Sequence, residues 1–210
     1  MRKHCFIRFI LFLIVIVSLN CIAQATQSPV NLMQRVANRL ITKLAQNKAI
    51  LKSSRADRFI HTQVNAIIVP IVNVNYMAQA VIGRYYWGQA TSAQRSAFIR
   101  QFKKLVIANY SAALASYDDD VVDVYPLRTN TWKKQGVATV QSVIKRKSGQ
   151  RISITYFMSN DTGRWLINDF TIENISIIEN YRAQFASSLS QGGLGHLVQQ
   201  LTAHNKAIRS

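Results

Sequence analysis

The chain has 210 residues, and its 26 Lys and Arg against 9 Asp and Glu give a formal net charge of +17. This length is typical of one domain, and 49% hydrophobic residues are enough for a sizeable core. Both cysteines lie within the first 21 residues, which excludes disulfides, thiol catalysis and cysteine-ligated zinc for the rest of the chain.

The first 25 residues have the three parts of a secretory signal peptide. An apolar run over residues 9–19 follows a basic region and precedes the small-x-small pattern Ala23-Gln24-Ala25. The run has 11 residues, whereas a membrane-spanning helix needs about 20. The basic region consists of Arg2, Lys3 and Arg8.

Cys21 raises the alternative of a lipid-modified cysteine, but Asn20 is too large for the position before such a cysteine. We therefore predict cleavage near Ala25, export to the periplasm and a single mature domain over residues 26–210. After cleavage, 23 basic residues stand against nine acidic ones, a net charge of +14. Export makes nucleic acid an unsuitable partner, so this charge favours anionic membrane surfaces, lipopolysaccharide or an acidic protein. Solubility alone is the alternative explanation.

The pattern of the first half predicts helices. Apolar residues recur every fourth position over 29–47, and a second helix is expected over 54–69, ending at Pro70. A short helix over 74–82 ends at Gly83. A long helix then runs from Thr91 or Ser92, as the N-cap, to about residue 117.

The second half changes to strand periodicity. Strands are expected over 121–125, 136–145, 151–158 and 164–172, with turns between the last three at Ser148-Gly149 and at 160–163. A helix over 177–189 breaks at Gly192-Gly193, and a final helix follows. This order predicts an α+β fold in which a curved, antiparallel or mixed sheet of about four strands is covered by helices and encloses an apolar pocket.

Two stretches resemble the MlaC or toluene-tolerance family of periplasmic phospholipid-binding proteins. The first contains Pro70–Val74, Val81–Gly83, Tyr86-Trp87, Gln94-Arg95, Phe98, Phe102, Leu105, Tyr110, Ala113-Leu114 and Tyr117. The second contains Gly163–Asp169, Ile172–Ser176, Asn180–Arg182, Phe185, Gly192 and Leu201. The sequence departs from the family at Asn73, where Asp is common, and at Asn174, where Gly is common.

The resemblance implies a deep apolar pocket that holds acyl chains while the headgroup stays near solvent. It also implies a carrier that moves phospholipid between an outer-membrane lipoprotein complex and an inner-membrane ABC transporter, as part of the Mla lipid-transport system that serves outer-membrane lipid asymmetry. A hopanoid or another lipid is the alternative cargo. No cofactor is implied.

The candidate pocket residues are apolar and aromatic residues whose side chains are expected to point toward the interior, although each could equally be an ordinary core residue. Alternation leaves open whether Trp165-Ile167-Asp169 or Leu166-Asn168-Phe170 faces the pocket. The candidates are Val81, Ile82, Tyr86, Trp87, Phe98, Phe102, Val106, Tyr110, Ile154, Tyr156, Trp165, Ile167 and Phe170.

Enzymatic interpretations have little support in the sequence. The histidines after residue 25 lack metal-ligand spacing, and no phosphate-binding glycine loop or GxSxG motif is present. The remaining enzymatic hypothesis is an isomerase in which Asp169 acts as a base and Tyr110 or Tyr156 stabilises an oxyanion. We expect a non-catalytic protein instead. A cationic envelope-binding protein without an internal ligand is a third hypothesis.

Overall fold

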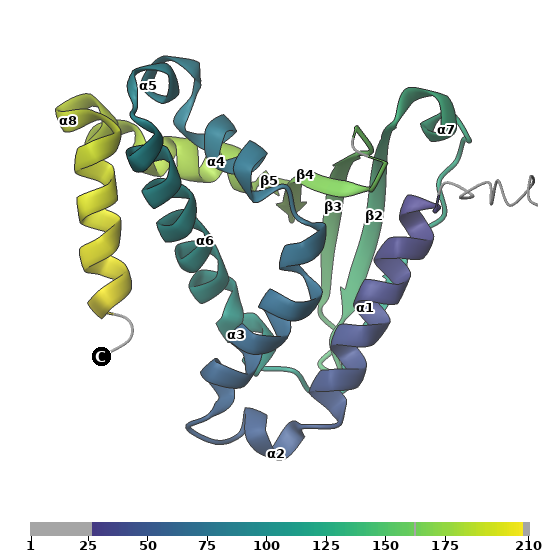
Figure 1. Cartoon of the computed structure of the whole chain (residues 1–210). Helices are drawn as coiled ribbons and strands as arrows, with labels where there is room; N and C mark the ends of the chain where they lie inside the picture. The colour runs from purple at the N-terminus through teal and green to yellow at the C-terminus, as the bar shows by residue number, and fades with distance from the viewer. Residues whose placement is uncertain (1–26, 162, 208–210) are drawn as a thin grey trace, which may run out of the picture.

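The computed structural model describes residues 27–161 and 163–207, so the predicted signal peptide lies outside the described residues. The described chain has the predicted α+β fold, an antiparallel sheet with helices packed against it (Figure 1). In Figure 1, α6 and α8 lie side by side on one arm and α1 lies beside β2 on the other. The short α2 and the longer α3 connect the two arms.

Helices occupy the chain up to the sheet, as predicted. Thr91 caps the longest of them through a capping box: its Oγ1 accepts from the Gln94 backbone N–H at 3.2 Å, and Gln94 Oε1 accepts from the Thr91 N–H at 2.9 Å. Two short helices, α2 and α5, were not predicted because four and six residues show no helical period. The segments are α1 Pro29–Ala45, α2 Lys48–Leu51, α3 Ala56–Ile67, the 3₁₀ turn η1 Val69–Ile71, α4 Val74–Ile82, α5 Arg84–Gln89 and α6 Ser92–Ala115.

The sheet has five antiparallel strands in the order β1-β2-β3-β4-β5. The four longer strands match the predicted ones, while the two-residue β5 and the helical turn α7, Trp132–Gln135, were not predicted. Between β4 and β5, Asn174 has φ 65°, a left-handed value that Gly adopts freely and Asn tolerates. The departure from the family's glycine is therefore compatible with the turn. The strands are β1 Val121–Val124, β2 Val137–Lys145, β3 Arg151–Ser159, β4 Leu166–Ile172 and β5 Ile175–Ser176.

Asn73 replaces the family's common Asp without loss of its local role. Its side-chain oxygen accepts a hydrogen bond from the Tyr76 backbone N–H at 3.2 Å, which caps α4 as a carboxylate would. Its amide also donates to Asn168 Oδ1 at 3.1 Å, and its backbone N–H donates to the Ile167 carbonyl at 2.8 Å. The start of α4 is thereby fixed to β4.

The last element, α8 Ile177–Ala207, is broken at the predicted glycine pair. Gly193 has φ 64° and ψ −163°, a combination that is essentially limited to glycine. The break allows both halves of α8 to bury apolar residues, among them Tyr181 and Phe185 before it and Leu197 and Leu201 after it.

Replacing Gly193 by Ala is expected to lower the free energy of unfolding by about 1–3 kcal/mol, because the side chain forces a strained backbone. Denaturant titration followed by circular dichroism measures the change. Gly88→Ala is the control, since an added Cβ at Gly88 has nothing within 4 Å and its φ lies outside the positive region. Equal stability of the two variants would show that the kink at Gly193 adapts to a side chain.

The buried side chains form three separate clusters rather than one core. The largest joins α4, α6 and α8, where Phe102 packs against Tyr181 with ring centroids 5.3 Å apart. The second lies between α1, α7 and the sheet and includes Met33 and Ile167. The third joins α1, α2 and α3 around Leu44. The three clusters surround a space that packed side chains do not fill.

Candidate functional site

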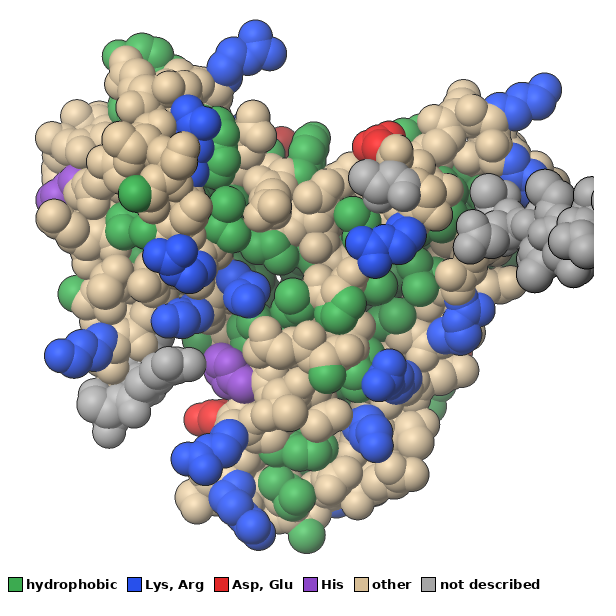
Figure 2. Space-filling view, in the orientation of Figure 1, with side chains coloured by type: hydrophobic (Ala, Val, Ile, Leu, Met, Phe, Trp, Pro, Cys, Tyr) green, Lys and Arg blue, Asp and Glu red, His purple; other side chains and the backbone are tan. Residues whose placement is uncertain are grey.

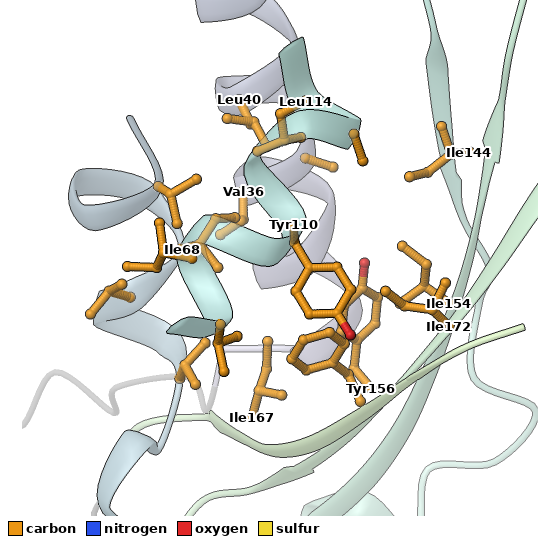
Figure 3. Close-up of a pocket in the computed structure, with 18 of the residues that line it drawn as sticks. Val36, Leu40, Ile68, Tyr110, Leu114, Ile144, Ile154, Tyr156, Ile167 and Ile172 are labelled. Atoms are coloured by element: carbon orange, nitrogen blue, oxygen red, sulfur yellow. The ribbon is translucent and has the colours of Figure 1, made fainter. Parts of the chain in front are cut away.

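That space is a cavity of about 500 Å³, within the range of about 300–1,000 Å³ that is typical of ligand pockets. It is bounded by α1, α3, α6 and the inner face of the sheet (Figure 3). Figure 2 shows hydrophobic side chains within the hollow between the two arms and Lys and Arg side chains around it. All three core clusters contribute to the wall, through Phe102, Met33, Ile167 and Leu44 among others.

The wall is almost entirely hydrophobic. Of its 32 residues, only Lys103, Ser111, Asp120 and Arg146 are neither hydrophobic nor tyrosine. Such a surface makes few hydrogen-bond demands on a ligand and therefore suits long hydrocarbon chains. The hydrophobic positions include Val36, Leu40, Ile41, Val64, Ile68, Val106, Ile107, Leu114, Ile144, Ile152, Ile154, Ile167, Phe170 and Ile172.

Three tyrosines, Tyr110, Tyr117 and Tyr156, line this wall, and Figure 3 shows Tyr110 and Tyr156. Burial raises the pKa of Tyr110, whose ring packs edge-on against Phe170 with centroids 6.3 Å apart. Burial also raises the pKa of Tyr156, while the Ser142 hydroxyl, which donates to Tyr156 at 3.2 Å, acts in the opposite direction. Tyr110 and Tyr156 are therefore both neutral at physiological pH, and neither adds charge to the cavity.

One end of the cavity holds a paired charge. Arg146 Nη1 lies 3.0 Å from Asp120 Oδ2, and only 16% and 7% of the two side chains are exposed. The guanidinium also donates to the Ser116 and Ala113 carbonyls at 3.1 and 3.3 Å, which satisfies the C-terminal end of α6. Asp120 Oδ1 is buried without a hydrogen-bond partner among the described residues. Arg146, which follows β2, is thereby joined to Asp120, which precedes β1, and to the end of α6.

Seven of the thirteen predicted pocket residues line the cavity: Phe102, Val106, Tyr110, Ile154, Tyr156, Ile167 and Phe170. The other six lie outside it. Val81, Ile82 and Phe98 are at most 3% exposed in the cluster between α4, α6 and α8, and Tyr86 and Trp87 pack against that cluster. Trp165 packs against Trp132 with ring centroids 5.9 Å apart. The first five pack there because α8 covers α4 and α6, whereas Trp165 belongs to the cluster between α1, α7 and the sheet. The sequence does not show either packing.

A β-bulge explains how both candidate faces of β4 contribute to the cavity. Phe157 pairs with Asp169, but the next residue, Met158, pairs with Ile167, so Asn168 is an extra residue in β4. The bulge shifts the alternation by one position, and Ile167 and Phe170 consequently both face the cavity. Neither of the two predicted alternations holds along the whole strand.

Asp169 does not contribute to the cavity wall. Its Oδ1 accepts from the Phe170 and Ile178 backbone N–H groups at 2.8 and 3.3 Å, and its Oδ2 accepts from the Ser176 hydroxyl at 2.6 Å. It fixes the start of α8 and lines a separate surface pocket with Arg182 and Asn168. The isomerase hypothesis requires this carboxylate to share a cavity with Tyr110 or Tyr156. It does not, because Asp169 does not line the cavity that the two tyrosines line.

The sequence did not identify the wall that α1 and α3 supply. The apolar stripe of α1 was predicted, but not that Val36 and Leu40 of that stripe line the cavity (Figure 3). Both side chains are partly exposed, and a periodic pattern does not predict which residues of an apolar stripe remain partly exposed.

Residues 27–161 and 163–207 offer neither a metal site nor a membrane-spanning helix. No group of three His, Cys, Asp or Glu side chains there could hold a metal ion. Within the same ranges, no helix has the length and apolar character required to cross a membrane.

The sequence profile described as MlaC protein matches residues 34–203. A Haemophilus influenzae protein named intermembrane phospholipid transport system binding protein MlaC is 26% identical over 191 residues, which cover 85% of this chain and 83% of that protein. Toluene tolerance protein ttg2D of Pseudomonas putida is 24% identical over 181 residues, covering 86% and 82%.

A solved structure from Ralstonia solanacearum shares the fold. It is described as a phospholipid-binding protein in complex with a phospholipid, and it matches with a TM-score of 0.78 at 24% sequence identity. The match covers 88% of this chain and 100% of that chain.

Proposed function

This chain belongs to the MlaC protein family, and we propose from that premise that it is a phospholipid carrier that performs no covalent chemistry. The carrier binds the acyl chains of one phospholipid in the cavity between α1, α3, α6 and the sheet and leaves the headgroup near solvent. The observation that carries this proposal is a cavity of about 500 Å³ whose wall is almost entirely hydrophobic. The names of the Haemophilus and Pseudomonas relatives and the ligand of the Ralstonia protein support the same cargo.

The free energies of an acyl chain in the cavity and in a bilayer are similar, as a reversible carrier requires. Burying one CH₂ group contributes about 0.8 kcal/mol, so two chains of roughly sixteen carbons gain on the order of 20 kcal/mol in the cavity. Leaving a bilayer costs a comparable amount, because the same groups are already buried there. Transfer between membrane and protein is therefore close to neutral, and a docked partner can direct it with a small change in cavity shape.

The wider setting of the carrier is part of the proposal. The signal-peptide pattern of residues 1–25 supports export to the periplasm. The carrier would receive and deliver lipid at an inner-membrane ABC transporter and an outer-membrane lipoprotein complex. The net charge of +14 after residue 25 favours its encounter with anionic membranes and acidic partners.

Native mass spectrometry of protein purified from periplasm without detergent tests the cargo. We expect an added mass equal to that of a phospholipid, lost on denaturation and identified by lipid extraction from the same sample. Protein with no added mass, which also takes up no lipid from vesicles, would contradict the proposal. Salt-sensitive binding to anionic vesicles without lipid extraction would then favour the envelope-binding hypothesis.

A further inference from the structure

The cavity wall contains three charged side chains, and two of them neutralise each other. Asp120 and Arg146 form the ion pair described above, and further hydrogen bonds of Arg146 go to carbonyl groups at the end of α6. The side chain of the third charged residue, Lys103, forms no ion pair or hydrogen bond with the described residues. Lys103 is thus the one charge in this wall that is available to a ligand.

Lys103 stands where the cavity face of α6 begins. That face continues through Val106, Ile107, Tyr110 and Leu114, which recur at helical spacing. One turn before Lys103, Ile99 packs against the cluster of α4 and α8 instead. Lys103 is half-buried, so its aliphatic stem lies against the apolar wall while the ammonium can stay in water.

The distance from Lys103 to the far end of α6 matches an acyl chain. Lys103 and Leu114 are eleven residues apart, about 16 Å at the rise of an α-helix. The acyl chains of one leaflet fill about 15 Å, half of the hydrocarbon thickness of a bilayer. Beyond Leu114, ion pairs join Asp118, Asp119 and Asp120 to Lys147, Lys48 and Arg146.

Two of the helices beside the cavity, α1 and α6, contain no acidic residue that would neutralise Lys103. The segment of α6 contains Arg95, Arg100, Lys103 and Lys104 and no Asp or Glu, and α1 has three basic residues and no acidic one. Like charges three or four residues apart destabilise a helix, as between Arg100 and Lys104. An anion bound near this turn would relieve that repulsion.

We infer that Lys103 binds the phosphate of the phospholipid headgroup and thereby orients the lipid, with its acyl chains directed along α6 toward Leu114. This inference rests on the proposed function and adds a specific contact to it. An ammonium–phosphate hydrogen bond is charge-assisted and strong enough to change affinity measurably. Hydrocarbon burial supplies most of the binding free energy, and Lys103 supplies the preference for a phosphate-bearing lipid.

The test compares two lipids with the same chains, dioctanoyl phosphatidylglycerol and dioctanoyl glycerol, by calorimetric titration of delipidated protein. We expect Lys103→Gln to weaken phosphatidylglycerol binding about tenfold and to leave dioctanoyl glycerol binding unchanged. Lys103→Arg should restore most of the affinity. Lys104→Gln is the matched control, since it removes the same charge from an exposed neighbour that does not line the cavity, and it should change neither affinity.

Three results would overturn the inference. Equal losses in the two glutamine variants would show a dependence on net charge alone. An equal loss of affinity for both lipids in Lys103→Gln would show that the aliphatic part of Lys103 only packs against the lipid and that its ammonium does not bind phosphate. Amide NMR shifts around Lys103 with inorganic phosphate alone would assign a site for free phosphate. Wild-type protein that binds neither lipid would overturn the carrier proposal as well, which distinguishes the two failures.

Discussion

Replacing Ile154 by Asp is expected to reduce phospholipid retention more than tenfold while the protein still folds. Ile154 points into the cavity from the middle of β3, beside Ile172 of β4 (Figure 3). An ionised carboxylate against acyl chains has no partner, and its desolvation costs several kcal/mol. In the empty protein the cavity can admit water, so the unliganded state does not bear this cost. Lipid extracted per mole of purified protein measures the effect.

The control for this variant is Thr155→Asp, one residue further along β3. Successive side chains of a strand point to opposite faces of the sheet, and Thr155 does not line the cavity. It pairs with Gln141 and Thr171, which are uncharged. Thr155→Asp should keep its lipid, and similar melting temperatures would show that both variants fold. Full lipid retention in Ile154→Asp would mean that the acyl chains bind elsewhere.

The sequence predicted the elements of this fold better than the cavity they enclose. Hydrophobic periodicity, capping residues and glycine breaks are features of the local sequence. They predicted the start of α6 at Thr91 and the break of α8 at Gly192-Gly193. Whether an apolar stripe faces a packed core or a hollow depends on how far apart the helices stand. For that reason Val81 and Phe98 were assigned to the pocket although they pack in the core, and Val36 and Leu40 of α1 were missed.

Aromatic residues in the sequence were also a poor predictor of which residues line the cavity. Eight of the thirteen predicted pocket residues are aromatic, yet four of them, Tyr86, Trp87, Phe98 and Trp165, do not line the cavity. Phe98 packs instead against Phe102 and Phe185, with ring centroids 5.5 and 6.0 Å apart. Edge-to-face and stacked ring pairs stabilise solid packing. The hollow is instead lined mainly by Val, Ile and Leu. The sequence also did not predict the β-bulge at Asn168, because one extra residue does not change the composition of a strand noticeably.

Replacing Arg146 by Met is expected to lower the free energy of unfolding by about 3 kcal/mol, the largest stability effect that we predict. The substitution leaves Asp120 charged, 7% exposed and without its partner, and one oxygen of that carboxylate already lacks a hydrogen bond among the described residues. It also removes the donors to the Ser116 and Ala113 carbonyls at the end of α6. Denaturant titration measures the change.

The neighbouring Lys145→Met is the control, because its ion pair with Asp123 is exposed at 44% and 38% of the two side chains. An exposed pair contributes at most about 1 kcal/mol, so this loss should be small. Adding Asp120→Asn to Arg146→Met should recover part of the lost stability, since a neutral amide replaces the unpaired charge. Equal losses for the two single variants would show that burial does not strengthen the inner pair. A large difference would show that the buried Arg146, through its ion pair with Asp120 and its hydrogen bonds to the end of α6, contributes to joining α6 to the sheet.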